Sequence, residues 1–132
     1  MACEKLCKAH LIKTGARPRD LQASHAYTRK HLPIVIRQEI TASGQDLKRM
    51  QSVMTLTRHL AAEVELLNPA VNLGGVRPDN CEYPWESGDT VISPLDWTFH
   101  PLELVAVRGG PTFIKLLKGA IARTLEELEK SA

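Results

Sequence analysis

The sequence predicts an all-α fold of about five helices in a compact bundle, and three observations support this prediction. Apolar residues recur at helical spacing over residues 2–13, 45–67 and 113–130. All eight prolines lie outside these three stretches, where they end or restart helices. The composition is that of an ordinary globular chain, with 43% hydrophobic and 24% charged residues.

The length predicts one domain spanning residues 1–132. A chain of 132 residues is long enough to bury a hydrophobic core, and no segment has the composition of a linker between two domains. The irregular part of the domain is expected at residues 68–92, which are rich in proline and glycine.

The first third of the chain predicts two helices. Residues 2–13 place Cys3, Leu6, Cys7 and neighbouring residues on one helical face. Residues 14–20 then interrupt this helix, and Asp20 is a candidate N-cap for a second helix that runs to about residue 30. Pro33 is expected to end or restart that helix.

Residues 34–41 are ambiguous, whereas residues 45–67 are not. The β-branched residues of 34–41 favour a strand, but the spacing of Ile36 and Ile40, with Pro33 in a first-turn position, favours a helix. We prefer the helix. Residues 45–67 carry a broad apolar arc that predicts the longest helix, and Asn68 and Pro69 are expected to end it.

Residues 68–92 predict a long irregular connection, which is functional, disordered or built from short strands. The only strand candidates in it are residues 71–73 and 90–92. Ser93 and Pro94 form a helix start signal, and a further helix is expected from about Pro101. Gly109 and Gly110 predict a stop before the last helix, whose apolar face is expected to carry Ile114, Leu117, Ile121, Leu125 and Leu128.

Charge is divided unevenly along the chain. Residues 1–59 carry eleven Lys or Arg against four Asp or Glu, a net of +7, and residues 60–132 carry six against eleven, a net of −5. A basic half of this kind predicts an anionic partner, either nucleic acid or an acidic protein surface. The predicted contact residues are Arg17, Arg19, Arg29, Lys30, Lys48 and Arg49. The alternative is that the two halves neutralise each other within the fold or across a homo-oligomer.

Aromatic residues cluster in the acidic half. Tyr83, Trp85, Trp97 and Phe99 lie within or beside the irregular connection. Tyr and Trp on loops are typical anchors of protein interfaces, so Tyr83 and Trp85 are predicted to bind a partner. The alternative is that the aromatic side chains fold the connection back onto the helices. With the C-terminal helix, this segment is expected to mediate assembly as a homo-oligomer or as a subunit of a complex.

Cys3, Cys7 and His10 form a C-x3-C-x2-H pattern on one side of the first predicted helix. Cysteine and histidine are the usual ligands of structural zinc, so these three residues are candidate metal ligands. The alternative is that they pack on the buried face of that helix. The odd number of cysteines predicts reduced thiols and a cytoplasmic protein. No apolar run is long enough to cross a membrane, and we expect no cofactor.

No catalytic motif is found, because the five histidines are scattered and the glycine pairs match no phosphate-binding loop. The sequence therefore predicts a non-enzymatic binding protein with a basic N-terminal half. A structural or oligomerising helical module is the second interpretation. A small metal-binding protein or enzyme that uses Cys3, Cys7 and His10 is the third.

Overall fold

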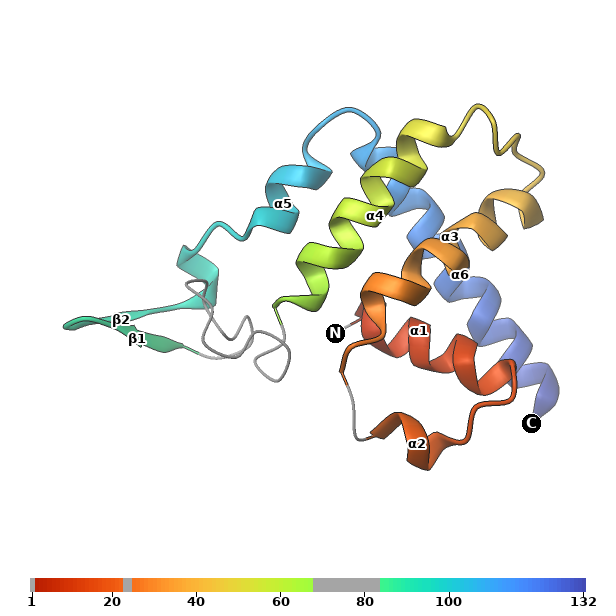
Figure 1. The fold of residues 1–132 in the computed structure, drawn as a ribbon, viewed down its shortest axis with the longest axis horizontal. Helices are drawn as coiled ribbons and strands as arrows, with labels where there is room; N and C mark the ends of the chain where they lie inside the picture. Colours follow the sequence, from red (N-terminus) through yellow and green to blue (C-terminus); the bar gives the residue numbers. More distant parts are fainter. Residues whose placement is uncertain (1, 23–24, 68–83) are drawn as a thin grey trace.

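The computed structural model describes residues 2–22, 25–67 and 84–132, and α-helices dominate them (Figure 1). The α-helices of these residues are α1 (Ala2–Lys13), α2 (Pro18–Gln22), α3 (Thr28–Ala42), α4 (Gln51–Glu65), α5 (His100–Val105) and α6 (Gly110–Ser131). They are accompanied by two short strands, β1 (Trp85–Ser87) and β2 (Thr90–Ile92), and by the 3-10 helix η1 (Pro94–Asp96). The all-α prediction is confirmed.

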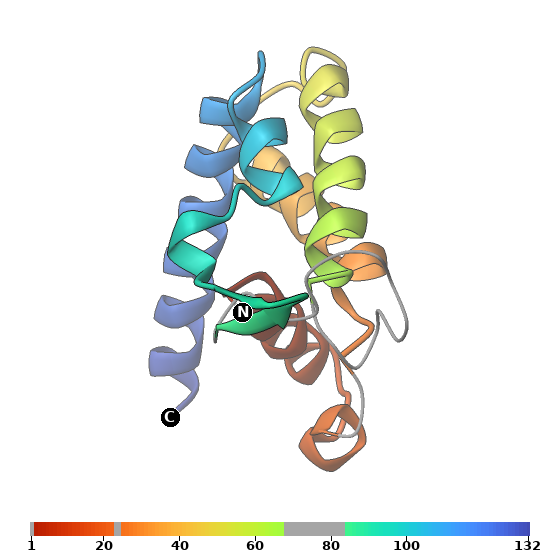
Figure 2. The ribbon, with the colours of Figure 1, turned by 90° about the vertical axis from the view of Figure 1, so that its left-hand side faces the viewer.

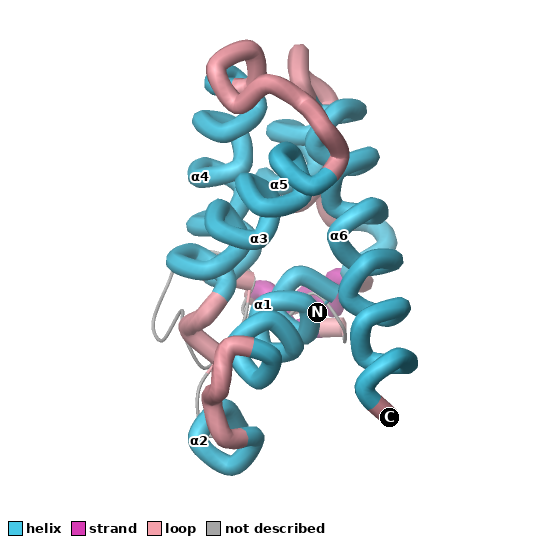
Figure 3. Tube along the Cα trace, turned by 90° about the vertical axis from the view of Figure 1, so that its right-hand side faces the viewer, coloured by secondary structure: helices cyan, strands magenta, loops and turns pink. Residues whose placement is uncertain are grey.

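Helix α3 is the centre of the fold. It packs against α4 on one side and against α1 and α6 on the other, and α5 contacts both α4 and α6. Figure 3 shows α1 crossing below α3 and beside α6. The side chains of Leu32, Ile36 and Ile40 are fully buried in α3, since its apolar arc is enclosed by these neighbouring helices.

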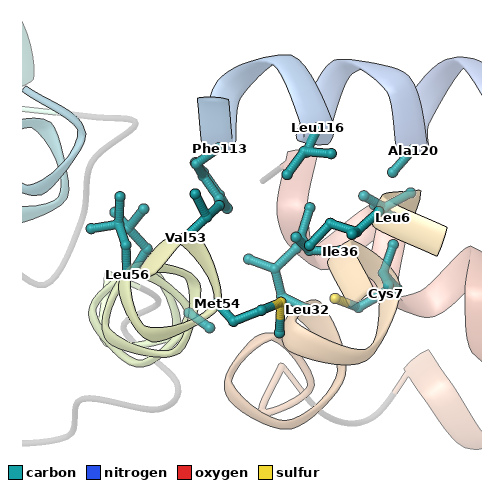
Figure 4. Close-up of a cluster of buried hydrophobic side chains, with 14 residues drawn as sticks. Leu6, Cys7, Leu32, Ile36, Val53, Met54, Leu56, Phe113, Leu116 and Ala120 are labelled. Carbon is teal, nitrogen blue, oxygen red and sulfur yellow. The ribbon is translucent and has the colours of Figure 1, made fainter. Parts of the chain in front are cut away.

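The hydrophobic core draws its side chains from α1, α3, α4 and α6 (Figure 4). The best-buried members outside α3 are Cys7, Leu60 and Ala61. Phe113, Leu116 and Ala120 of α6 close the core from the opposite side. Because α1 supplies Leu6 and Cys7, the predicted buried face of residues 2–13 is confirmed.

The predicted helix from Asp20 to about residue 30 is wrong. Helix α2 contains only five residues, and α3 begins at Thr28 and continues through Pro33 to Ala42. A proline in the second turn of a helix removes one backbone hydrogen bond. Burial of the apolar arc of α3 outweighs that loss, because tertiary packing overrides helix propensity. The preferred helix at residues 34–41 is confirmed as part of α3.

Helix α4 begins at Gln51, six residues later than predicted. Gly44 has a φ of +74°, which ends α3 in the left-handed conformation that glycine tolerates. Asp46 then forms a turn, since its Oδ1 accepts a hydrogen bond from the Lys48 N–H at 3.0 Å. In the part of the chain that the structure describes, α6, with 22 residues, is longer than α4, with 15.

Residues 85–92, at the end of the predicted irregular connection, are built from short strands, one of the alternatives that the sequence left open. They form an antiparallel hairpin in which Trp85 pairs with Ile92, Glu86 with Val91 and Ser87 with Thr90. The strand candidate at residues 90–92 is therefore confirmed. The candidate at residues 71–73 and the predicted stop at Asn68 and Pro69 lie outside the described residues.

The start signals in the C-terminal third are confirmed. Ser93 Oγ accepts a hydrogen bond from the Leu95 N–H at 3.2 Å and so caps η1. Gly109 has a φ of +93° just before α6. A Cβ atom on Gly110 would lie 1.7 Å from the Val105 carbonyl oxygen, so the junction of α5 and α6 has no room for a side chain there.

The apolar face predicted for the last helix is only partly correct. Ile114, Leu117 and Ile121 pack partly buried against the core, but Leu125 and Leu128 are 55% and 46% exposed. The buried residues of this helix are Gly110, Phe113, Leu116 and Ala120. The difference arises because α6 turns the face that carries Phe113, Leu116 and Ala120 to the core, and the predicted stripe lies to one side of that face.

The central position of α3 predicts that replacing two of its isoleucines by alanine lowers the free energy of unfolding by very different amounts. Ile36→Ala should lower the free energy of unfolding by about 2–5 kcal/mol, because it leaves a cavity in the core. Ile34 is 41% exposed, so Ile34→Ala should cost less than about 1 kcal/mol. Urea denaturation followed by circular dichroism measures both, and equal losses would contradict the central role of α3.

Candidate anion-binding site

The predicted partner-binding cations do not form one surface. They lie at α2 (Arg17 and Arg19), in the first turn of α3 (Arg29 and Lys30) and in the turns before α4 (Lys48 and Arg49). In Figure 1, α2 lies at the bottom of the molecule and the turns before α4 lie at the top. The structure therefore separates this predicted set into three groups.

Three of these six cations contact a neighbouring carboxylate. Arg17 Nε lies 2.7 Å from Asp20 Oδ2, and Arg19 Nε lies 3.9 Å from the other oxygen of the same carboxylate. Arg49 Nε lies 3.8 Å from Asp46 Oδ2. Exposed pairs of this kind add little stability, but they reduce the positive field at α2 and in the turns.

The basic and acidic halves of the chain also contact each other directly. Lys13 of α1 pairs with Glu127 of α6, and Arg123 Nε of α6 donates to Glu39 Oε2 of α3 at 2.8 Å. Both pairs line a cavity of about 190 Å³ between α1, α3 and α6, beside His10. Glu39 raises the pKa of Arg123, and Lys13 lowers the pKa of Glu127. Part of the charge asymmetry is thus cancelled inside the fold.

Within residues 1–59, five of the six cations without a described carboxylate partner lie on α3, on α4 or in the turns between them. Among the described residues, several Lys and Arg side chains of α3, α4 and the turns between them contact no carboxylate. They are Arg29, Lys30, Arg37, Lys48 and Arg58, and all are exposed. These cations are spread over the packed helices α3 and α4 and the turns between them, and we call this part of the protein the cationic surface.

A shallow pocket of about 560 Å³ opens on this surface between the start of α3, the second half of α4 and α5. Figure 1 shows α4 lying between α5 and α3. The pocket is lined by Arg29, Arg58, His59, Ala62, Glu63, His100 and Leu104. Two guanidinium groups and two imidazoles thus meet in one concave site, and we call it the cationic pocket.

The end of α4 fixes the position of Arg29. The Arg29 backbone N–H donates to Glu65 Oε1 at 3.1 Å. A carboxylate at this place satisfies a free N–H of the first turn of α3 and is stabilised by the helix dipole. The same bond joins the end of α4 to the start of α3. Arg29 and Arg58 are therefore brought to one pocket although 29 positions separate them in the sequence.

Helix α5 supplies the third wall of the pocket. His100 is its first residue, and His100 Nδ1 lies 3.1 Å from Glu103 Oε2. His59 lies next to Arg58 on the exposed face of α4. Two arginines and one carboxylate, Glu63, line the pocket, so its formal charge is positive even when both histidines are neutral.

The chemistry of the pocket is that of a binding site for oxyanions. Each guanidinium offers five N–H donors in a planar arrangement that matches phosphate and carboxylate oxygens. The two arginines therefore equip the pocket to bind an oxyanion such as a phosphate or a carboxylate.

Three pocket residues, Arg58, His59 and His100, were missed by sequence reasoning. Arg58 and His59 are adjacent on an amphipathic helix, and that position predicts only that they are exposed. Their contribution to a site depends on the packing of α4 between α3 and α5, which no local spacing reveals.

The structure describes only some of the aromatic residues of the acidic half. Tyr83 lies outside the described residues, and Trp85 is the first residue of β1. Trp97, which follows η1, is 40% exposed. Neither Trp97 nor Phe99 is among the described residues that line the cationic pocket.

Cys3, Cys7 and His10 lie on α1 as predicted. Within residues 2–22, 25–67 and 84–132, no three His, Cys, Asp or Glu side chains are placed to hold a metal ion. Cys7 has no exposed surface, and burial raises the pKa of its thiol to about 12. A metal ligand must be a thiolate, so the packing alternative describes Cys7 better.

Comparison with known proteins gives no relative of this chain: no family model, curated protein or solved structure matches it. None of the described helices has the length and the apolar character needed to span a membrane.

The burial of Cys7 predicts that its thiol is protected from alkylation. At pH 8, iodoacetamide should modify Cys7 only after the chain is unfolded in urea, because the buried thiol stays protonated and inaccessible. Mass spectrometry of the peptide that contains Cys7, before and after unfolding, measures this difference. Rapid modification of Cys7 in the folded protein would contradict its place in the core.

The histidines near α1 predict a loss of stability at acidic pH. Burial, reinforced by nearby Lys13 and Lys30, lowers the pKa of His10 and of His31 below their ordinary value of 6.5. The unfolded chain then binds more protons than the folded chain below about pH 7. The free energy of unfolding should fall as the pH is lowered through 6.5.

Urea denaturation at several pH values between about 7.5 and about 5.5 measures this dependence. The double variant His10→Gln/His31→Gln should show a flatter profile than the unchanged chain. An equally steep profile in the double variant would assign the dependence to other groups.

Proposed function

We propose that this chain is a non-enzymatic helical binding protein that holds a nucleic acid on its cationic surface. The observation that supports the proposal is that Arg29 and Arg58 line one exposed pocket, and that neither guanidinium contacts a carboxylate among the described residues. Nearby, Lys30 and Arg37 extend the positive charge along α3.

A phosphate-binding role would account for the cations that contact no described carboxylate. A protein surface normally mixes charges of both signs, and single-sign surfaces serve to attract a ligand of the opposite sign. Two of the three carboxylates of α3 and α4 are occupied elsewhere, and the third, Glu63, lines the cationic pocket together with two arginines. Glu39 is buried beside Arg123, and Glu65 accepts the backbone N–H of Arg29. The cationic surface is therefore available to an anionic partner.

The shape of the site favours contact with the nucleic-acid backbone over base reading. The pocket is shallow, and its lining residues come from three helices rather than from one helix that presents a row of side chains. Sequence-specific recognition in grooves normally uses a helix or ribbon whose side chains reach base edges. We therefore propose binding through phosphates, with little dependence on base sequence.

The proposed interaction predicts strong salt dependence. Fluorescence anisotropy with labelled duplex and single-stranded oligonucleotides should give affinities that fall on the order of a hundredfold between about 50 and 200 mM salt, if about four phosphates are contacted. Arg58→Gln should weaken binding and lower the salt slope by about one, because it removes one phosphate contact.

Arg19→Gln is the matched control, because Arg19 is exposed but lies at α2 beside Asp20. This substitution should leave both the affinity for the oligonucleotides and the slope of its salt dependence nearly unchanged. Equal effects of the two substitutions, or affinity that does not respond to salt, would reject nucleic acid as the partner. Binding of polyglutamate in place of the oligonucleotides would instead indicate an acidic protein.

A second candidate function, a structural or oligomerising helical module, is favoured by the pairs that join the two halves of the chain. Lys13 pairs with Glu127 and Glu39 pairs with Arg123, so some opposite charges do meet within one molecule. If no polyanion binds at low salt, this interpretation replaces the first.

A further inference from the structure

The hairpin and η1, residues 85–97, form an arm that projects from the helical body (Figures 1 and 2). The two strands pair with each other, and neither makes an extensive contact with a described helix. No side chain described between residues 84 and 97 is buried. Because an isolated two-stranded hairpin is marginally stable in water, an arm of this kind gains stability from a partner.

The arm is both apolar and acidic. Val91 is 67% exposed and Leu95 is 95% exposed, which is unusual for side chains of this size. Glu86, Asp89 and Asp96 are also exposed, and residues 85–97 contain no Lys or Arg. A complementary surface would therefore combine an apolar floor with positive charge and would carry no carboxylate.

Helix α3 has such a surface on the side turned away from the core. A shallow groove of about 500 Å³ is lined by Ile34, Arg37, Gln38, Thr41 and Ala42. Ile34 is 41% exposed and supplies the apolar floor. Arg37 supplies the charge and contacts no carboxylate among the described residues.

We infer that the arm of one molecule docks in the α3 groove of a second copy of this chain. In this contact, Leu95 of one molecule lies on Ile34 of the other, and Asp96 of the first molecule pairs with Arg37 of the second. Figure 1 shows the hairpin well apart from the middle of α3, so this contact requires two molecules. Reciprocal exchange of two arms gives a closed dimer with twofold symmetry, the most common form of homo-oligomer.

Charge complementarity between the arm and the groove selects a second copy as the occupant. The segment 85–97 carries three negative charges and no positive charge, and the described lining of the groove carries one positive charge and no negative charge. Each molecule therefore contains both halves of the interaction. Arg37 belongs both to the cationic surface and to this groove, so the two proposals share one cation, but the test of the dimer contains no nucleic acid.

Sedimentation equilibrium of the full chain tests the dimer. The unchanged chain should show a monomer–dimer equilibrium that weakens as salt is raised. Arg37→Glu and Asp96→Arg should each weaken dimerisation about tenfold or more, because each places like charges opposite one another. Arg19→Glu, at α2, is the control and should leave the equilibrium unchanged.

Mixing the Arg37→Glu and Asp96→Arg chains gives the decisive result. In the mixed dimer, the carboxylate introduced at position 37 of one chain faces the guanidinium introduced at position 96 of the other. The second interface keeps the original pair, so mixed dimers should form where neither variant dimerises alone.

Two results would overturn the inference. An unchanged chain that stays monomeric at all concentrations would assign the arm to a different protein. Variants that fail to recover dimerisation on mixing would also contradict the docking of the arm on α3, once circular dichroism shows that both are folded.

Discussion

The burial of α3 on three sides is the constraint on which the rest of this structure depends. Leu32, Ile36 and Ile40 are fully buried, and α3 packs against α1, α4 and α6. The helix keeps its course through Pro33, because the apolar area it buries is worth more than one lost backbone hydrogen bond. Its exposed side then places Arg29 and Arg37 on the surface.

Burial also determines which charged side chains form ion pairs and which stay exposed without a partner. Glu39 is only 6% exposed, and a buried carboxylate is costly without a partner. Arg123 supplies that partner, and Gly119 makes space for it, because a Cβ atom there would lie 2.7 Å from Glu39 Oε1. With Glu39 paired with Arg123 and Lys13 with Glu127, four cations of the basic half, Arg29, Lys30, Arg37 and Arg58, stay on α3 and α4 without a described carboxylate partner.

Local signals predicted those elements that depend on local chemistry. The first helix, the strand at residues 90–92, the Ser93 cap and the restart at Gly109 and Gly110 all follow from spacing or from turn residues. The continuation of α3 through Pro33 could not be predicted from local signals, because the stability of this helix comes from three neighbouring helices. The cationic pocket did not follow either, since its residues from α3, α4 and α5 meet only through packing.

The central claim is that charge left unpaired by the fold gathers on α3 and α4 to receive an anionic partner. The most direct measurement is an NMR titration of the ¹⁵N-labelled chain with a short oligonucleotide, read from the backbone amides. The amide chemical shifts should change at Arg29 and Lys30, around Arg58 and at the start of α5. Those of α2 should stay unchanged. Shift changes centred on α2, or none at all at low salt, would contradict it.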